Sequence, residues 1–289
     1  MSAVPGIRAL RRRGGIDSYR DRVVVVTGAG SGMGRAYARA LAARGAVLAL
    51  NDYDPAALAE TVDQLPAGTR VLTEAYDVAD RAASYAFAAT VREQLGGADV
   101  VINTAGIEGG VQPTWALGDA DYERVMAVNF SGVLHGTRAF LPHLLERGSG
   151  AIVNVSSIFG LVGTPSHSDY CASKFAVRGF TEALAAELVD TRIGVHLVHP
   201  GGIATAIARK ENSQAFAAKY LSTSADEIAE VVLDGVLAGR SRIVHGHSAG
   251  RTWLGARVLP MRAMAWLTHR DIGPTLDRSA YAALRRARG

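Results

Sequence analysis

A tyrosine and a lysine stand four residues apart in the chain, at Tyr170 and Lys174. Because residues i and i+4 share one face of an α-helix, a helix here would bring a phenol and an ammonium together. A neighbouring cation favours the phenolate and moves the pKa of a phenol from about 10 toward neutral pH. Such a phenol can exchange a proton with a substrate oxygen, so the pair predicts general acid–base catalysis.

Lysine is rare in this chain, which has 3 lysines and 28 arginines. A compact ammonium with three donors and a planar guanidinium are not interchangeable at a tight site. The lysine at position 174 therefore indicates a specific role. A surface Tyr/Lys pair is the alternative if nothing else converges on it.

Two further polar side chains belong to the same hypothesis. Ser157 follows the apolar run Ala151–Val155, so we expect its hydroxyl at the carboxyl end of a strand, where open α/β folds bind ligands. Asn129 lies within the apolar stretch Val125–Val133, where a buried amide must find hydrogen-bond partners. Taken alone, Asn129 also fits a purely structural polar contact.

A glycine-rich turn follows the first apolar run and leads into a predicted helix. It reads Thr27-Gly28-Ala29-Gly30-Ser31-Gly32-Met33-Gly34. Glycines permit a tight turn and let backbone N–H groups approach a pyrophosphate, which a helix N-terminus favours electrostatically. A plain strand–helix turn is the alternative, but the preceding strand, the following helix and a suitably spaced acid favour a dinucleotide site.

That acid is Asp52, which ends the second predicted strand 18 residues after Gly34. A carboxylate about 20 residues beyond such a turn bonds the adenosine ribose hydroxyls, and it would repel the 2′-phosphate of NADP. Ser31, Tyr53 and Asp54 add no positive charge at this end of the site. The sequence therefore favours NAD over NADP.

Short apolar runs and longer helix-like stretches must position these residues. The runs lack the in/out alternation of half-exposed strands, which is typical of a parallel sheet covered on both faces. The predicted strands are Val23–Val26, Val47–Leu50, Val71–Tyr76, Val100–Asn103, Ala151–Val155, Val195–Val198 and Arg242–His245. The predicted helices are Met33–Arg44, Pro55–Gln64, Arg81–Leu95, Asp119–Glu146, Ser168–Val189 and Ser224–Ala238. This order predicts an α/β fold, a single Rossmann-like, doubly wound parallel sheet of about seven strands with helices on both faces.

Composition and charge narrow the possible partners. The chain has 289 residues, and its 48% hydrophobic and 20% charged content is that of a globular protein. Its net charge of +4 comes from the two ends, because residues 16–234 carry a net −8 (17 basic against 25 acidic). Nucleic-acid binding needs a basic face on the folded body, and we therefore expect none.

The chain shows no sign of export or of a membrane span. Cys171 is its one cysteine, which excludes an intrachain disulfide and fits a reducing compartment. The basic start is not followed by an apolar core segment, and no stretch approaches the roughly 20 apolar residues of a span. We expect a cytoplasmic protein. His245 and His247 lack further ligands nearby, and we predict no metal site.

We predict one catalytic domain, residues 21–246, between an N-terminal arm (1–20) and a C-terminal appendage (247–289). The appendage is basic and amphipathic, mixes tryptophan and methionine with arginine, and has no acid from residue 240 to 270. It could pack on a neighbouring subunit or on the substrate pocket, brace its own chain, or contact an anionic membrane surface. Pro260 argues against one continuous helix.

Together these motifs resemble the short-chain dehydrogenase/reductase family over about residues 20–246. The glycine turn matches its cofactor loop, Asp52 its NAD-selecting acid, and Tyr170-x-x-x-Lys174 with Ser157 its active site. The resemblance implies that further residues contact the cofactor: Asp77 and Val78 at the adenine, Asn103, Ala105 and Gly106 after the fourth strand, and Pro200, Gly201, Ile203 and Thr205 beside the nicotinamide. It departs from the family pattern at Thr104, where an asparagine is usual.

The resemblance also implies the roles. Tyr170 would donate or accept the proton, Lys174 would lower its pKa and bind the nicotinamide ribose, Ser157 would hydrogen-bond the reacting oxygen, and Asn129 would hold a water. A homo-oligomer, dimer or tetramer, is expected. Substrate identity lies beyond the sequence, although Phe159, Leu161 and Val162 suggest an apolar wall and hence a hydrophobic alcohol or ketone.

Two other functions compete with this one. An NAD-dependent epimerase or dehydratase would need a larger substrate domain than any segment here provides. A non-catalytic NAD-binding sensor or scaffold would be expected to lack some of the catalytic residues, and all four are present.

Overall fold

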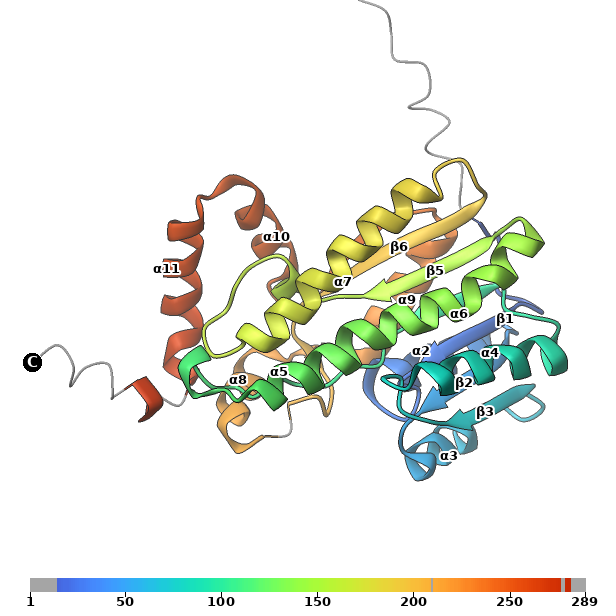
Figure 1. Ribbon diagram of the computed structural model, residues 1–289, viewed down its shortest axis with the longest axis horizontal. Helices are drawn as coiled ribbons and strands as arrows, with labels where there is room; N and C mark the ends of the chain where they lie inside the picture. Colours follow the sequence, from blue (N-terminus) through green and yellow to red (C-terminus); the bar gives the residue numbers. More distant parts are fainter. Residues whose placement is uncertain (1–14, 209, 277–278, 282–289) are drawn as a thin grey trace, which may run out of the picture.

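The computed structural model describes residues 15–208, 210–276 and 279–281. A seven-stranded sheet forms its centre, in the order β3-β2-β1-β4-β5-β6-β9, with every neighbouring pair parallel (Figure 1). The strands are β1 (Val23–Thr27), β2 (Val47–Asp52), β3 (Val71–Ala75), β4 (Val100–Asn103), β5 (Gly150–Val155), β6 (Ile193–Pro200) and β9 (Arg242–His245). A separate pair, β7 (Ile203–Ala204) and β8 (Thr223–Ser224), lies outside this sheet. The predicted fold class is confirmed.

Helices cover both faces of the sheet. The helices are α2 (Gly32–Ala43), α3 (Pro55–Asp63), α4 (Arg81–Leu95), α5 (Asp119–Met126), α6 (Gly132–Arg147), α7 (Ser168–Glu187), α8 (Gln214–Tyr220), α9 (Ala225–Leu237), α10 (Ala249–Val258) and α11 (Met261–Ile272). One core cluster joins α2 and α9 to the sheet, for example through Leu41 and Leu233. A second joins α4, α6 and α7 to the opposite face, for example through Phe87, Phe140 and Leu184.

The stretch predicted as one helix from Asp119 to Glu146 changes its hydrogen bonding midway. Between α5 and α6 it passes through a π-helical turn, Ala127–Ser131, which contains Asn129. Single π-helical turns inside α-helices are rare overall, but those that occur are often found at functional sites. The sequence pattern predicts one uninterrupted helix and does not reveal this turn.

The start of the described chain is tied to the core. Ile16 and Tyr19 are buried, and the Tyr19 hydroxyl donates a hydrogen bond to the carbonyl of Leu233 on α9 (2.9 Å). Burial raises the pKa of this phenol. Most of the predicted N-terminal arm (1–20) lies outside the described residues, so its boundary at residue 20 stays a prediction.

The described part of the C-terminal appendage contains two helices, which are separated at Pro260 as the sequence predicted. Helix α10 ends at Val258, and α11 begins at Met261, directly after Pro260. In the part of the chain that the structure describes, no helix combines the length and the apolarity needed to cross a membrane.

Removal of the Tyr19 hydroxyl tests the anchoring of the N-terminal segment. We expect Tyr19→Phe to lower the free energy of unfolding by about 1 kcal/mol or more, because the Leu233 carbonyl loses its buried donor. Urea denaturation measures this, with Tyr53→Phe as the control at a phenol that is 65% exposed. Equal stability of Tyr19→Phe and wild type would show that the hydrogen bond contributes nothing.

Candidate active site

A cavity of about 550 Å³ opens at the carboxyl ends of the central strands. Residues that follow β1, β4, β5 and β6 line it, and these four strands are neighbours in the sheet. Its volume lies within the range of small-molecule and cofactor sites. In doubly wound sheets the carboxyl ends on either side of the point where the strand order reverses form the binding crevice. Here that point lies between β1 and β4.

Most of the residues selected from the sequence meet in this one cavity. Those that line it are Gly28, Ser31, Gly32, Met33, Gly34, Asp52, Tyr53, Asp77, Val78, Ala105, Gly106, Ser157, Tyr170, Lys174, Pro200, Gly201, Ile203 and Thr205. They come from segments up to 177 residues apart, from Gly28 to Thr205. The tertiary fold therefore assembles the constellation that the sequence suggested.

Asn103 does not line the cavity, and its contact with a cofactor stays a prediction. Its side chain is buried below the strand ends, where the amide nitrogen donates to Asn154 Oδ1 (2.8 Å) and Thr137 Oγ1 (3.1 Å). Asn154 donates in turn to Thr181 Oγ1 on α7 (3.1 Å). Asn103 is thus part of a buried network that ties β4 and β5 to α6 and α7.

Asn129 also lies outside the cavity lining, although it borders the site. Its Oδ1 accepts from the N–H of Ile107 (2.8 Å), and its Nδ2 donates to the carbonyl of Ile107 (3.0 Å) and to Ser173 Oγ (3.2 Å). The side chain therefore fixes the loop after β4 against α7. Its role in holding a water stays a prediction.

The glycine turn has a geometry that larger residues could not adopt. Gly28 and Gly32 have positive φ angles, +72° and +49°. A Cβ at Gly28 would lie 2.7 Å from Ala105 Cα, and one at Gly34 would overlap with the carbonyl oxygen of Gly28. The turn is therefore packed against its neighbours, with its surface open to the cavity and the N-terminus of α2 directly behind it.

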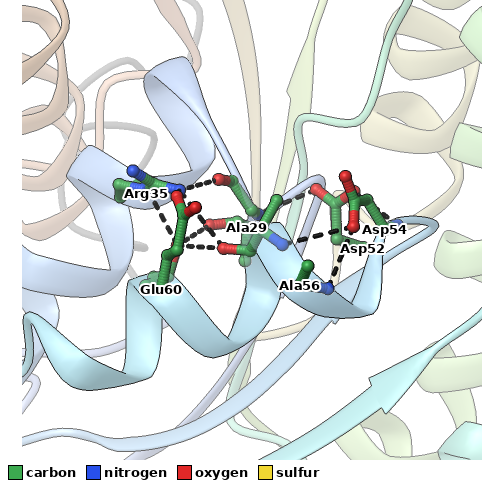
Figure 2. A network of polar contacts seen from close by, with 9 residues as sticks. Ala29, Arg35, Asp52, Asp54, Ala56 and Glu60 are labelled. Carbon is green, nitrogen blue, oxygen red and sulfur yellow. Dashed lines mark hydrogen bonds and ion pairs between the residues drawn. The ribbon is translucent and has the colours of Figure 1, made fainter.

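Figure 2 shows how side chains hold this turn from behind. The Arg35 guanidinium donates to the carbonyl of Gly30, to Thr61 Oγ1 (2.9 Å) and to Glu60 Oε2 (3.0 Å). Thr61 also donates to the carbonyl of Ala29 (2.9 Å). The Arg35 guanidinium thus points toward α3 and away from the cavity, which it does not line.

Asp52 holds the turn from its other side while its carboxylate faces the cavity. Oδ2 accepts from the N–H of Gly30 (2.8 Å), and Oδ1 accepts from the N–H of Asp54 (3.1 Å; Figure 2). Asp54 itself caps α3 through the N–H groups of Ala56 and Ala57, as its position before a helix suggested. A carboxylate thus stands at the end of β2, where a ribose diol would find acceptors.

Asp77 is engaged by a partner that the sequence did not reveal. Arg124 on α5 donates to its Oδ2 (2.7 Å), and both residues line the cavity. The glycine turn has the chemistry to bind a pyrophosphate, the Asp52 carboxylate to bind a ribose, and this pair to contact the base of a dinucleotide. The residues present therefore fit such a cofactor.

Tyr170 and Lys174 lie one turn apart on α7, facing Ser157 at the end of β5. The Lys174 ammonium lies 5.5 Å from the centre of the Tyr170 ring and donates to the carbonyl of Val155 (3.2 Å). The Ser157 hydroxyl oxygen accepts from the N–H of Phe159 (3.1 Å). The predicted meeting of a phenol, an ammonium and a hydroxyl at one site is present in the structure.

The pKa values of the pair depart from their usual ranges in opposite directions. Burial lowers the pKa of Lys174 to about 8. Burial raises the pKa of Tyr170, and a hydrogen bond with Ser157 offsets this only in part. The direction for Tyr170 is opposite to the sequence expectation, because desolvation of the phenolate outweighs the hydrogen bond with Ser157. In this structure the phenol of Tyr170 is therefore neutral at neutral pH.

Glu108 and His167, at the other end of the cavity, escaped the sequence analysis. Glu108, His167 and Phe216 line it beside Phe159, which the sequence had suggested as part of an apolar wall. Burial lowers the pKa of His167, so its ring is neutral at neutral pH. Leu161 and Val162 are buried but do not line the cavity. No spacing signal links these positions, which come from the segments after β4 and β5 and from α8.

Known proteins share both the sequence and this architecture. A family model described as short chain dehydrogenase matches residues 22–215. SadH from Mycobacterium tuberculosis (strain ATCC 25618 / H37Rv) is 43% identical over 259 residues, covering 84% of this chain and 93% of that protein. Levodione reductase from Leifsonia aquatica is 37% identical over 200 residues, covering 68% and 74%. The crystal structure of a short chain dehydrogenase/reductase from Burkholderia phymatum in complex with NAD has a TM-score of 0.77 at 30% identity, covering 91% of this chain and 98% of that one.

The lowered pKa of Lys174 predicts a pH dependence of stability. Since the unfolded chain holds this proton up to about pH 10.5 and the folded chain only to about 8, stability is reduced below pH 8 and rises as pH increases above it. We expect wild type to gain about 2 kcal/mol relative to Lys174→Met between about pH 7 and about pH 9.5. Urea denaturation at both pH values measures the difference. Parallel stability curves for the two proteins would disprove the shift.

Proposed function

Because the chain belongs to the short-chain dehydrogenase/reductase family, as its motifs predicted, we propose that it is an NAD(H)-dependent oxidoreductase that interconverts an alcohol and a carbonyl. The observation that carries the proposal is that Tyr170, Lys174 and Ser157 line the same cavity as the glycine turn and Asp52. A proton donor and a dinucleotide site thus share one space. Neither a scaffold nor a sensor needs that combination.

The chain's own residues divide into a binding half and a reacting half. The glycine turn and the N-terminus of α2 would hold the pyrophosphate, Asp52 the adenosine ribose, and Thr205 the nicotinamide end. When bound, the dinucleotide supplies the hydride acceptor or donor. Asp52 leads us to propose NAD rather than NADP, and the NAD complex of the Burkholderia phymatum protein supports this.

The proton belongs to Tyr170. In carbonyl reduction its neutral phenol donates to the substrate oxygen, and in alcohol oxidation the same oxygen accepts the proton. The Ser157 hydroxyl is placed to hydrogen-bond that substrate oxygen as its charge changes. The Lys174 ammonium adds a positive charge beside the phenol ring, which opposes the burial that holds the proton on Tyr170.

We propose a hydrophobic alcohol or ketone as the substrate. Beyond Tyr170 the cavity is lined by Phe159, Phe216 and the neutral ring of His167, and such walls favour an apolar molecule. The relative named levodione reductase supports a carbonyl substrate. A homo-oligomer is also expected, as it was from the sequence.

A panel of hydrophobic secondary alcohols and ketones tests the proposal directly. The full chain is incubated with each compound and NAD⁺ or NADH, and the absorbance of NADH is followed. Turnover of at least one compound supports an oxidoreductase. Tight binding of NAD(H) without turnover of any compound would favour the non-catalytic alternative.

Loss of the Tyr170 hydroxyl should separate chemistry from binding. We expect Tyr170→Phe to lower kcat by about 10²- to 10⁴-fold, because the general acid–base is gone. The Kd for NADH should change little, since the ring remains. Fluorescence titration measures the Kd, and Tyr85→Phe on α4 is the matched control. Near-normal turnover by Tyr170→Phe on the best substrate would reject the assignment.

The Asp52 carboxylate should determine the choice of cofactor. We expect Asp52→Ala combined with Tyr53→Arg to raise the ratio of kcat/KM for NADP over NAD about 100-fold or more, because one charged hydrogen bond is lost and one repulsion is replaced by attraction. Asp54→Ala is the control, since this acid caps α3 and does not line the cavity. It should cost about 1 kcal/mol of stability and leave the ratio unchanged. An unchanged ratio in the double variant would contradict the proposal.

A further inference from the structure

The C-terminal hairpin, which we define as α10 and α11 with the turn between them (residues 249–272), projects from one end of the molecule (Figure 1). Its turn is formed by Leu259 and Pro260. The apolar side chains next to this turn are unusually exposed, Val258 by 66% and Met261 by 84%. Leu254, Leu259, Trp266 and Leu267 are exposed as well. Clusters of exposed apolar side chains mark interaction surfaces in soluble proteins.

The base of the hairpin, in contrast, is firmly packed. Ile272 is buried together with Leu276, Phe159 and Tyr220. The Tyr220 hydroxyl donates to the carbonyl of Asp271 (2.7 Å). The two helices meet where Gly255 faces Met264, since a Cβ on that glycine would lie 3.1 Å from the sulfur. The tip is therefore exposed although the base of the hairpin is anchored to the rest of the protein.

The hairpin carries only positive charge until its last turn. Arg251, Arg257, Arg262 and Arg270 are exposed. Asp271 is the first acid after residue 240, and it lies within 3.8 Å of the Lys219 ammonium. The arginines stay next to apolar groups, because Arg257 stacks over the Trp253 ring (4.4 Å) and Arg270 over the Trp266 ring (5.2 Å).

The order of side chains along α11 distinguishes a protein partner from a lipid surface. Arg262, Trp266 and Arg270 follow one another at intervals of four, so the indole lies between two guanidiniums on one helix face. A rigid protein partner would have to bury these charges against matching acids. An anionic lipid surface accepts both groups, because arginines reach the phosphates while indole and aliphatic side chains enter the boundary of the acyl chains.

We propose that the C-terminal hairpin docks on an anionic lipid surface, with Val258 and Met261 at its tip entering the apolar layer and the surrounding arginines binding lipid phosphates. This proposal rests on the residues of the hairpin and does not depend on the proposed function. If the proposed function also holds, the shared cluster of Ile272 and Phe159 connects the base of the hairpin to the apolar end of the cavity.

Vesicle cosedimentation of the full-length protein tests the proposal. We expect binding to vesicles of phosphatidylcholine with phosphatidylglycerol, weak or no binding to phosphatidylcholine alone, and a decrease with added salt. Val258→Glu combined with Met261→Glu should weaken binding about tenfold or more. Leu145→Glu on α6 is the matched control, because that leucine is also half-exposed (50%) and lies outside the hairpin. Since all three positions are exposed, the variants should keep the thermal stability of wild type.

Other outcomes would overturn the proposal. Equal binding of wild type to neutral and anionic vesicles, or an equal loss in Leu145→Glu, would show that the hairpin is not the anionic-lipid site. If wild type ignores vesicles and the Val258/Met261 double variant instead changes the molar mass measured by light scattering, the hairpin is an interface with a second copy. A blue shift of tryptophan fluorescence on anionic vesicles, lost in the double variant, would support docking independently.

Discussion

The burial of one ammonium, Lys174, organises this protein. Transfer of a lysine charge out of water is costly, and the pKa of about 8 is the measure of that cost. Neighbouring residues must therefore provide the hydrogen bonds that hold Lys174 in this buried position. The carbonyl of Val155 accepts from its Nζ, and Ser156 Oγ donates to its backbone carbonyl (2.8 Å). Strand β5 and helix α7 are thus joined at the point where the chemistry is proposed.

The rest of the catalytic end follows from keeping α7 in position. Asp169, fully buried, accepts from the N–H groups of Gly110 and Tyr170 (both 2.7 Å), which ties the loop after β4 to the tyrosine. Asn129 holds Ile107 in the same loop from the π-helical turn. The hydrogen bonds of two buried polar side chains therefore determine where the cavity wall stands relative to the phenol. Buried polar networks of this kind specify a structure only when their members are satisfied.

Sequence reasoning succeeded where one physical signal dominated. Apolar runs predicted the central strands, since both faces of these strands are buried, and the i, i+4 spacing placed Tyr170 and Lys174 on one face of a helix. It could not give the orientation or burial of side chains that tertiary packing decides. Asn103 ends a strand that leads to the cavity, yet its amide turns into the buried network with Asn154. The direction of the Tyr170 pKa depends on burial, which spacing does not encode. Glu108 and His167 reach the cavity through loops without periodic patterns.

Asp52 shows why binding and architecture cannot be treated separately here. The carboxylate that we expect to select the cofactor also accepts from the N–H of Gly30, within the glycine turn itself. Arg35 holds the carbonyl of the same residue from the opposite side. The N–H and the carbonyl of Gly30, which belong to two successive peptide groups, are thus held by opposite charges, and this sets the shape of the turn that would face a pyrophosphate. Exchange of Asp52 for a residue without an acceptor would leave the Gly30 N–H without this bond, so the proposed cofactor selection and the shape of the turn depend on the same carboxylate.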